Sequence, residues 1–188
     1  MNNLIKIQES LFFKNDGEID LLTGAMAPNR FNQIVKRDIE LAERNGISLA
    51  IISLKLNLES LLGSENNDYS LNLSEPLINL SDQSPKQSVA STNLNNDLIS
   101  TIKSDIESIL IRMNFELKSI IRSSDCISRV SQTGFWIFIS AATSEGLQIL
   151  KNRIEELFPK IISIVVIPRN KNQNQVSWYE SIDLIHFK

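Results

Sequence analysis

The sequence predicts an α/β (α+β) domain, with a mixed central sheet covered by helices and a single domain over residues 1–188. Two runs of strand length, residues 48–56 and 161–167, are apolar on both faces, as is typical of strands buried inside a sheet. Segments with a helical period of apolar residues alternate with them. The long helix expected between the first strand and a hairpin would act as a crossover, which predicts mixed strand directions.

Three segments are predicted to be helices: 29–44, 97–121 and 144–157. The first ends at Asn45-Gly46, a typical C-terminal stop. Asp97 is a candidate N-cap for the second helix and Ser144 for the third.

The tetrapeptide Ser131-Gln-Thr-Gly134 is predicted to be the turn of a hairpin between strands 126–130 and 135–140. Both flanks are β-branched or aromatic, and Gly134 tolerates a positive φ. The alternation of Phe135, Trp136 and Phe138 along a strand favours packing, with one set in the core and one outside, over a base-stacking platform.

Composition excludes several classes of protein. The 188 residues are 42% hydrophobic and 22% charged, which fits a globular domain. The longest apolar run is too short to cross a bilayer, and the N-terminus lacks the apolar block of a signal peptide, so we expect a cytoplasmic protein without a membrane partner. One cysteine, Cys126, and one histidine, His186, argue against disulfides, cysteine-based zinc sites and Ser-His-Asp triads. A net charge of −3 gives no general attraction for nucleic acid.

Residues 60–96 are predicted to be a disordered, low-complexity insertion, because Ser, Asn, Asp, Gln and Pro dominate and Lys86 is the only basic residue. The alternative is that its spaced leucines, Leu71, Leu73, Leu77 and Leu80, dock as a short strand or turn. Near the C-terminus, Trp178-Tyr179 is expected to be part of a docked tail, and the basic patch 169–171 a solvated turn.

Three short motifs follow one another along the chain. The first, Asp20-Leu-Leu-Thr-Gly-Ala25 followed by Phe31, resembles the opening Asp-x-Leu-Thr-Gly turn and first helix of the GGDEF (diguanylate cyclase) family. Leu54-Lys-Leu-Asn57 lies where the family carries an Asp-x-Asp pair. Arg122-Ser-Ser-Asp125 and Arg129-Val-Ser-Gln-Thr-Gly-Phe135 lie where it carries Arg-x-x-Asp and Arg-x-Gly-Gly-Asp-Glu-Phe. The resemblance covers most of the chain outside the insertion and implies a nucleotidyl-cyclase-like sheet.

The acids that the resemblance implies for metal binding are missing. In the family, two divalent ions are held by the first Asp of the strand pair and by an acid of the hairpin. The degenerate positions here are Lys55, Asn57, Ser131, Gln132, Thr133 and Gly134, none of which is a carboxylate. An ammonium repels a dication, so we predict no metal, no cofactor and no cyclase activity; an active diguanylate cyclase is the least favoured interpretation. The guanine-reading segments have no clear counterpart, and Glu107 matches their last Asp only faintly.

Arg122 and Asp125 keep the spacing of the family's inhibitory site for cyclic di-GMP. A guanidinium can bind phosphate or a guanine edge, and a carboxylate can accept the N–H groups of the base. Alternatively, the pair only caps the long helix and ties it to the hairpin. Lys55 also has two interpretations: direct contact with a phosphate, or a polar strand end with its head in water.

Two functions are therefore predicted. The first is a catalytically inactive GGDEF-like signalling domain, a regulatory module that binds cyclic di-GMP or another guanine nucleotide at Arg122 and Asp125. The alternative is a protein–protein interaction or dimerisation domain without a nucleotide ligand. Because the resemblance implies dimers and larger signalling systems, a protein partner or a homodimer is expected in either case.

Overall fold

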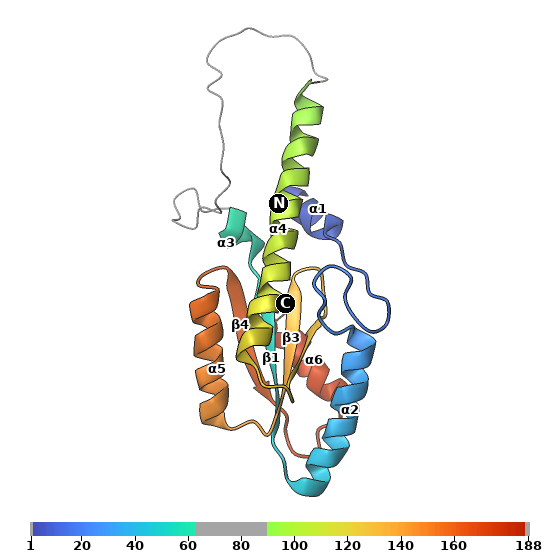
Figure 1. Cartoon of the computed structure of the whole chain (residues 1–188), viewed down its shortest axis with the longest axis vertical. Coiled ribbons are helices and arrows are strands. Elements are labelled where there is room, and N and C mark those ends of the chain that lie inside the picture. Colours follow the sequence, from blue (N-terminus) through green and yellow to red (C-terminus); the bar gives the residue numbers. More distant parts are fainter. Residues whose placement is uncertain (1, 63–89, 187–188) are drawn as a thin grey trace.

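A computed structural model describes residues 2–62 and 90–186 (Figure 1). One sheet runs through its centre, and its strands are β1 (Leu49–Leu56), β2 (Cys126–Arg129), β3 (Gly134–Ser140) and β4 (Ile162–Pro168). Their order across the sheet is β2-β3-β1-β4. The predicted α+β class, with helices packed over a central sheet, is confirmed.

The strand directions differ from the expected mixture. Each neighbouring pair of named strands is antiparallel. β1 and β2 do run parallel, as a helical crossover requires, but β3 returns from the hairpin and lies between them. Among the described residues, parallel pairing is confined to an isolated bridge between Met26 and Ser128.

Helices cover both faces of the sheet (Figure 1). They are α1 (Asn2–Ser10), α2 (Pro28–Asn45), α3 (Leu58–Leu62), α4 (Ala90–Ile120), α5 (Ser144–Leu157) and α6 (Gln175–His186). One apolar cluster joins the sheet to α1, α4 and α5, and a second joins the opposite face to α2 and α6. The strands are therefore buried on both sides, as their continuous apolar runs predicted.

The three predicted helices are confirmed, but the second begins at Ala90 and ends at Ile120 instead of spanning 97–121, and two predicted caps are wrong. Asp97 lies inside α4, which begins at Ala90, so it is no cap. α5 is capped by Thr143, whose hydroxyl accepts a hydrogen bond from the Gly146 N–H, and not by Ser144. The C-terminal stop of α2 is as predicted: Gly46 adopts the left-handed conformation with φ 66°.

The hairpin forms as predicted, although for a different reason. Among the described glycines, positive φ occurs at positions 17, 24 and 46, and Gly134 instead begins β3 in register with Lys55. The turn is closed by the N–H of Val130, which donates to the carbonyl of Gly134.

The aromatic side chains of the hairpin lie in the core, as predicted, but neither set is outside. Phe135 belongs to the α4/α5 side, whereas Trp136 and Phe138 belong to the α2/α6 side. The C-terminal tail docks as helix α6, with Trp178 fully buried. Arg169 is not part of a solvated turn: its side chain is 6% exposed and pairs with Glu43.

Most of the predicted insertion lies outside the described residues. Residues 60–62 end α3 and 90–96 begin α4, so both ends are helical. The span 63–89, which holds the four spaced leucines, is not described. Within the described residues, no helix is both long and apolar enough to cross a membrane.

Candidate functional site

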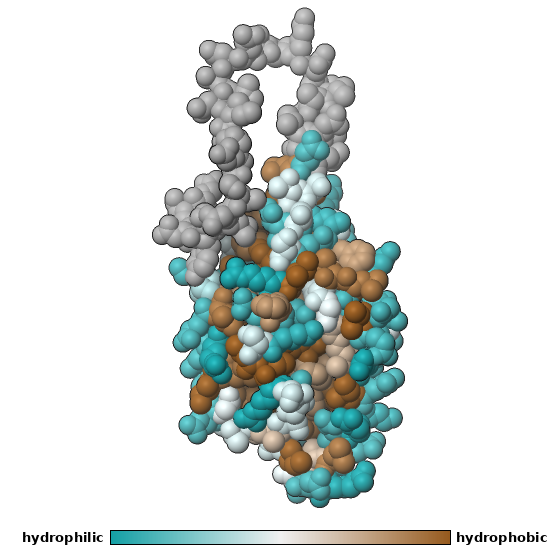
Figure 2. Space-filling model, viewed as in Figure 1, coloured by the Kyte–Doolittle hydropathy of each residue, from teal (hydrophilic) through white to brown (hydrophobic). Residues whose placement is uncertain are grey.

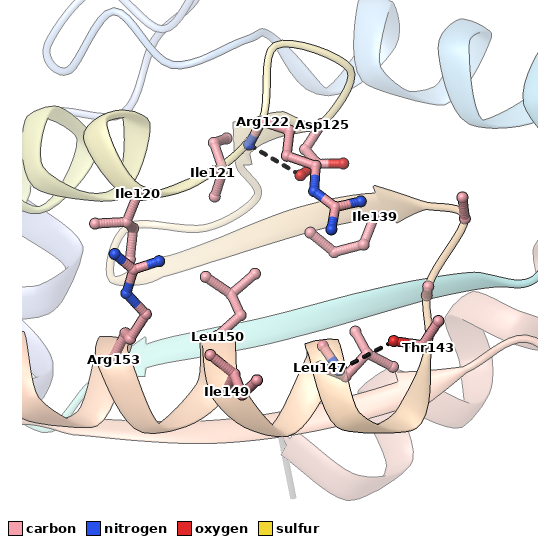
Figure 3. Close-up of a pocket in the computed structure, with 13 residues that line it drawn as sticks. Ile120, Ile121, Arg122, Asp125, Ile139, Thr143, Leu147, Ile149, Leu150 and Arg153 are labelled. Atoms are coloured by element: carbon pink, nitrogen blue, oxygen red, sulfur yellow. Dashed lines mark hydrogen bonds between the residues drawn. The ribbon is translucent and has the colours of Figure 1, made fainter.

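A cavity of about 210 Å³ lies where the C-terminal end of α4 meets the end of β3 and the first turns of α5 (Figure 3). Its charged lining residues are Arg122, Asp125 and Arg153. Its apolar lining includes Ile139, Leu147 and Leu150. The cavity therefore combines an apolar floor with two guanidinium groups and one carboxylate, a net charge of about +1 that favours an anionic ligand.

The structure brings the two predicted site residues together in one turn. The Asp125 carboxylate accepts a hydrogen bond from the backbone N–H of Arg122 at 3.1 Å, and the Asp125 N–H donates to the Arg122 carbonyl at 3.0 Å. This closes a tight turn, as the capping interpretation predicted. The Arg122 guanidinium does not fold back onto Asp125; it extends toward Ile139 (Figure 3) and forms no ion pair within the described residues.

Arg153 is a member of the site that sequence reasoning missed. It is exposed on α5, at the other end of the cavity from Arg122, and its guanidinium extends toward Ile120 (Figure 3). Leu150 lies between the two arginines. The sequence signal that could have identified Arg153 is its spacing. Gly146, Leu150 and Arg153 follow one another at intervals of four and three, which places them on one face of a helix.

The rim of the cavity between β3 and α5 is conformationally tight. Ala141 has a φ of 53°, in the left-handed region that disfavours residues with a Cβ. Gly146 leaves room for the Thr143 cap, since a Cβ at position 146 would lie 2.9 Å from the Thr143 hydroxyl oxygen. These two positions fix the start of α5 beside the cavity.

Lys55 and Asn57 lie at the end of β1, beside the hairpin turn. They are the positions where the GGDEF resemblance implies acids and this sequence has none. Lys55 is half-buried in β1, in register with Gly134 on one side and Ser163 on the other. The Asn57 side chain accepts a hydrogen bond from the Ser60 N–H at 3.1 Å, so it caps the short helix α3. Asn57 therefore has a local structural role that its position in the sequence did not reveal.

A buried ion pair joins two of the sequence motifs. Arg129 is 0% exposed and Asp20 is 1% exposed, and the guanidinium lies 3.3 Å from the carboxylate. Asp20 also accepts hydrogen bonds from the backbone N–H and the hydroxyl of Thr23. Gly24 completes this turn with a φ of 69°, which explains a glycine at that place. Burial lowers the pKa of Arg129, and the charge of Asp20 opposes that shift.

Arg129 also holds two other segments. It donates hydrogen bonds to the carbonyl of Phe12 at 2.8 Å and to the carbonyl of Gln132, in the hairpin turn, at 2.7 Å. Its guanidinium lies 5.2 Å from the ring of Phe13. One side chain therefore connects the segment after α1, the Asp20 turn and the hairpin.

No family model and no curated protein sequence matches the sequence. Solved structures are similar. The GGDEF domain of DgcB from Caulobacter crescentus in complex with c-di-GMP has a TM-score of 0.62 at 10% identity, over 91% of this chain and 88% of that one. The FimX GGDEF domain from Pseudomonas aeruginosa has a TM-score of 0.59 at 12% identity, over 90% of each chain. Diguanylate cyclase SiaD with its activator SiaC, also from Pseudomonas aeruginosa, has a TM-score of 0.61 at 12% identity, over 97% of this chain and 59% of that one.

The chain has the GGDEF-domain fold. In this GGDEF fold, the hairpin positions 131–134 form a turn held by protein contacts. The Thr133 carbonyl accepts a hydrogen bond from the Leu56 N–H at 2.9 Å, which ties the turn to the end of β1. In the part of the chain that the structure describes, no group of three or more His, Cys, Asp or Glu residues is placed to hold a metal ion.

His186 reaches the same sheet from the end of α6, a contact that the sequence did not suggest. Its Nδ1 lies 2.5 Å from the Ser53 hydroxyl and its Nε2 lies 3.1 Å from the Ser163 hydroxyl. Burial, followed by the positive charge of Lys55, lowers the pKa of His186. A neutral imidazole can donate to one serine and accept from the other, so His186 pins the last turn of α6 to β1 and β4.

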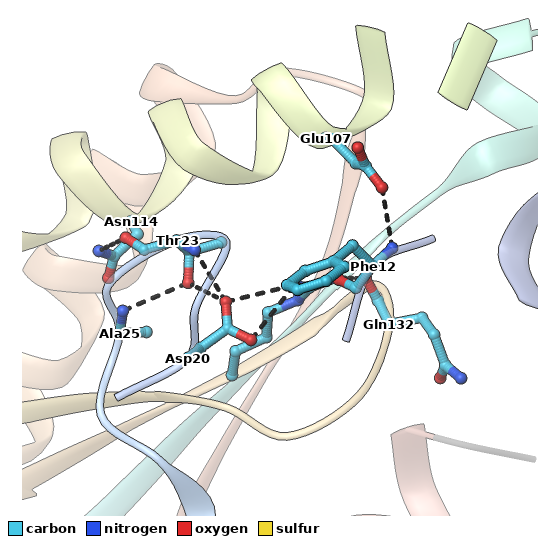
Figure 4. A network of polar contacts seen from close by, with 8 residues as sticks. Phe12, Asp20, Thr23, Ala25, Glu107, Asn114 and Gln132 are labelled. Carbon is cyan, nitrogen blue, oxygen red and sulfur yellow. Dashed lines mark hydrogen bonds and ion pairs between the residues drawn. The ribbon is translucent and has the colours of Figure 1, made fainter. Parts of the chain in front are cut away.

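Glu107, the faint match to a guanine-reading acid, has a structural partner. Its carboxylate accepts a hydrogen bond from the backbone N–H of Phe12 at 2.8 Å (Figure 4). Lys103, one turn earlier on α4, lies 3.8 Å from the same carboxylate. Glu107 therefore anchors the segment that follows α1 to helix α4.

Proposed function

We propose that this GGDEF-fold chain is a catalytically inactive signalling domain that binds cyclic di-GMP in the cavity between Arg122 and Arg153. The observation that carries the proposal is the pair of exposed guanidinium groups at either end of an apolar-floored cavity. Neither arginine forms an ion pair within the described residues, so both are available for a phosphate or a guanine edge.

The size of the cavity limits how the ligand would sit. A volume of about 210 Å³ is below the roughly 300–1,000 Å³ of sites that enclose a drug-sized ligand. One base would therefore enter the apolar part, and a phosphate would remain at the mouth near a guanidinium. One oxygen of Asp125 already accepts the Arg122 N–H, whereas the other has only a 3.5 Å contact with Ser124, so it can accept a hydrogen bond from a base.

Titration calorimetry with cyclic di-GMP, GTP and GDP, with and without magnesium, tests the proposal. We expect heat with cyclic di-GMP alone, independent of magnesium. Arg122→Ala and Arg153→Ala should each abolish it, while Arg44→Ala, an exposed arginine on α2, should leave it unchanged. Absence of heat at millimolar ligand would favour the second candidate, an interaction or dimerisation domain without a nucleotide.

The absence of cyclase activity is the second part of the proposal. It rests on Lys55, whose ammonium occupies the strand position of a metal-binding acid, and on a hairpin turn without carboxylates. We expect no cyclic di-GMP from GTP with magnesium or manganese. Product from pure protein would contradict this. The triple variant Lys55→Asp, Thr133→Asp and Gly134→Glu should also be inactive, because the guanine-reading segments have no clear counterpart in the sequence.

A further inference from the structure

An exposed apolar patch lies where helix α4 meets the segment that follows α1. Phe115 of α4 is 72% exposed, the highest value among the large apolar side chains of residues 2–62 and 90–186, and Ile111, one turn earlier, is 44% exposed. In the segment after α1, Phe12 is 36% exposed and Leu21 is 53% exposed. Figure 2 shows apolar side chains beside α4 on this face of the molecule, with hydrophilic ones around them. Exposed apolar side chains that gather in one place mark an interaction site.

Hydrogen bonds hold the segment after α1 against α4 at the patch. The Glu107 carboxylate of α4 accepts a hydrogen bond from the Phe12 N–H at 2.8 Å. The Asn114 side chain donates to the Thr23 carbonyl at 2.7 Å, two residues after Leu21. The two exposed apolar positions of α4 lie between these contacts and directly after the second one. The four apolar side chains therefore belong to one continuous surface that two elements build together.

The border of the patch is positively charged. Lys14 is exposed beside Leu21, since the Lys14 carbonyl accepts the Leu21 N–H at 2.8 Å. On α4, Arg112 is 71% exposed and Lys118 is also exposed. Glu116, 3.9 Å from Arg112, is the acid of this part of the border, and the Lys–Glu pair near Phe12 cancels. Three cations against one acid leave a local net charge of about +2, although the whole chain carries −3.

We propose that this patch binds an amphipathic helix of another protein, with the apolar face of that helix on Ile111 and Phe115 and acidic residues along its flanks. Adding a strand would require free backbone groups, whereas the Phe12 N–H and the Thr23 carbonyl are already bonded to α4. A helix satisfies its own backbone and presents only side chains. Acidic flanks meet the positive border, and basic flanks would be repelled by it.

Fluorescence anisotropy without nucleotide tests the proposal with two labelled helical peptides of about 18 residues, or about five turns. Both carry leucines at alternating intervals of four and three; one carries glutamates on the flanks, and the other carries lysines at the same positions. We expect a micromolar dissociation constant for the glutamate peptide and an affinity at least about tenfold weaker for the lysine peptide. Equal affinities for the two peptides, or no binding of the glutamate peptide at near-millimolar protein, would overturn the proposal.

Two substitutions in the patch have matched controls on the helices that cover the other face of the sheet. Phe115→Glu should weaken binding of the glutamate peptide at least about tenfold, whereas Val176→Glu, at a 67% exposed position on α6, should not. Lys14→Glu should weaken it several-fold, whereas Lys36→Glu, at an exposed position on α2, should leave it nearly unchanged at physiological salt. Unchanged far-UV circular dichroism would confirm that the variants are folded. Equal losses in a variant and its control would refute the assignment of the patch.

Two other occupants would give different results. If a second copy covered the patch, sedimentation equilibrium of the chain alone would show dimers that Phe115→Glu dissociates. If a membrane covered it, vesicles that contain phosphatidylserine would bind the chain, and Phe115→Glu would release it. Either result would overturn the proposal. Because nucleotide is absent throughout, these outcomes do not depend on whether the Arg122 cavity binds cyclic di-GMP.

Discussion

Two arginines seven residues apart, Arg122 and Arg129, occupy opposite environments. Arg129 is fully buried and is held by Asp20, the Phe12 carbonyl and the Gln132 carbonyl. Arg122 is exposed, and its guanidinium extends over a cavity. The difference arises from their positions relative to β2. Arg129 lies in the strand, where two loops close over it, whereas Arg122 lies in the turn before the strand begins.

This contrast separates a residue that maintains the fold from one that, in our proposal, binds a ligand. A buried guanidinium must have its charge and most of its N–H groups satisfied by the protein, because desolvation is costly. An exposed arginine is already satisfied by water and can exchange that water for a phosphate at little cost. The same residue type therefore gives opposite expectations for stability and for binding.

The largest effect should come from Arg129→Ala, which leaves the Asp20 carboxylate buried without its partner. We expect the free energy of unfolding to fall by about 3–5 kcal/mol, as for other broken buried pairs. Urea denaturation followed by circular dichroism measures it. Arg122→Ala is the matched control and should change the same quantity by no more than about 0.5 kcal/mol. Similar losses in both variants would remove the contrast.

Asp125→Ala sharpens the comparison within the cavity. It removes the acceptor for the Arg122 backbone N–H, so we expect a loss of about 0.5–2 kcal/mol, comparable to that of a missing helix cap. Combined with a neutral Arg122→Ala, this result would assign the turn to Asp125 and leave Arg122 to the ligand. If Asp125→Ala were also neutral in denaturation, the cap would not contribute to stability.

The four strands and helices α2, α4 and α5 were predictable because their signals are local, whereas the short helices α1 and α3 were not predicted. The apolar runs of β1 and β4, the helical periods of α2 and α5 and the hairpin depend on residues close in sequence. Strand order was less accessible, since only pairing in space places β3 between β1 and β2. The buried residues of α6, Trp178, Ile182 and His186, follow at the helical interval of four. The segment was nevertheless foreseen only as a docked tail, because exposed apolar residues such as Leu184 and Ile185 blur its pattern.

The candidate site was predictable only in part. Arg122 and Asp125 were marked by their motif spacing, but the motif does not reveal that the carboxylate accepts a backbone N–H while the guanidinium forms no ion pair with residues 2–62 and 90–186. Arg153 joins the site only when α5 folds onto α4. His186 likewise meets Ser53 across 133 positions of the chain, a contact that no local pattern encodes.

A smaller effect on stability is expected when a change of pH alters the protonation of His186, which is buried like Arg129. Its pKa is lowered in the fold, so below the ordinary histidine value of 6.5 the unfolded chain binds more protons and stability falls. Protonation also removes the acceptor nitrogen that a serine needs, a loss of about 1 kcal/mol. Denaturation between pH 8 and pH 5 measures it. His186→Gln should flatten this dependence, and an equally steep curve in that variant would assign the effect to other groups.

The smallest predicted effect concerns Ala141, on the rim of the cavity. A left-handed φ costs a residue with a Cβ about 1–2 kcal/mol, and glycine avoids that cost. Glycine also gives the unfolded chain more freedom, which offsets about 0.5–1 kcal/mol. We therefore expect Ala141→Gly to stabilise the fold by about 0.5 kcal/mol, measured by thermal and urea denaturation. Ala142→Gly, next in the chain and without a positive φ, is the control and should destabilise the fold.

If the strain at Ala141 instead holds the start of α5 in position for a ligand, Ala141→Gly would both stabilise the fold and weaken cyclic di-GMP binding. A gain in stability with unchanged binding would show that the rim strain has no part in the site.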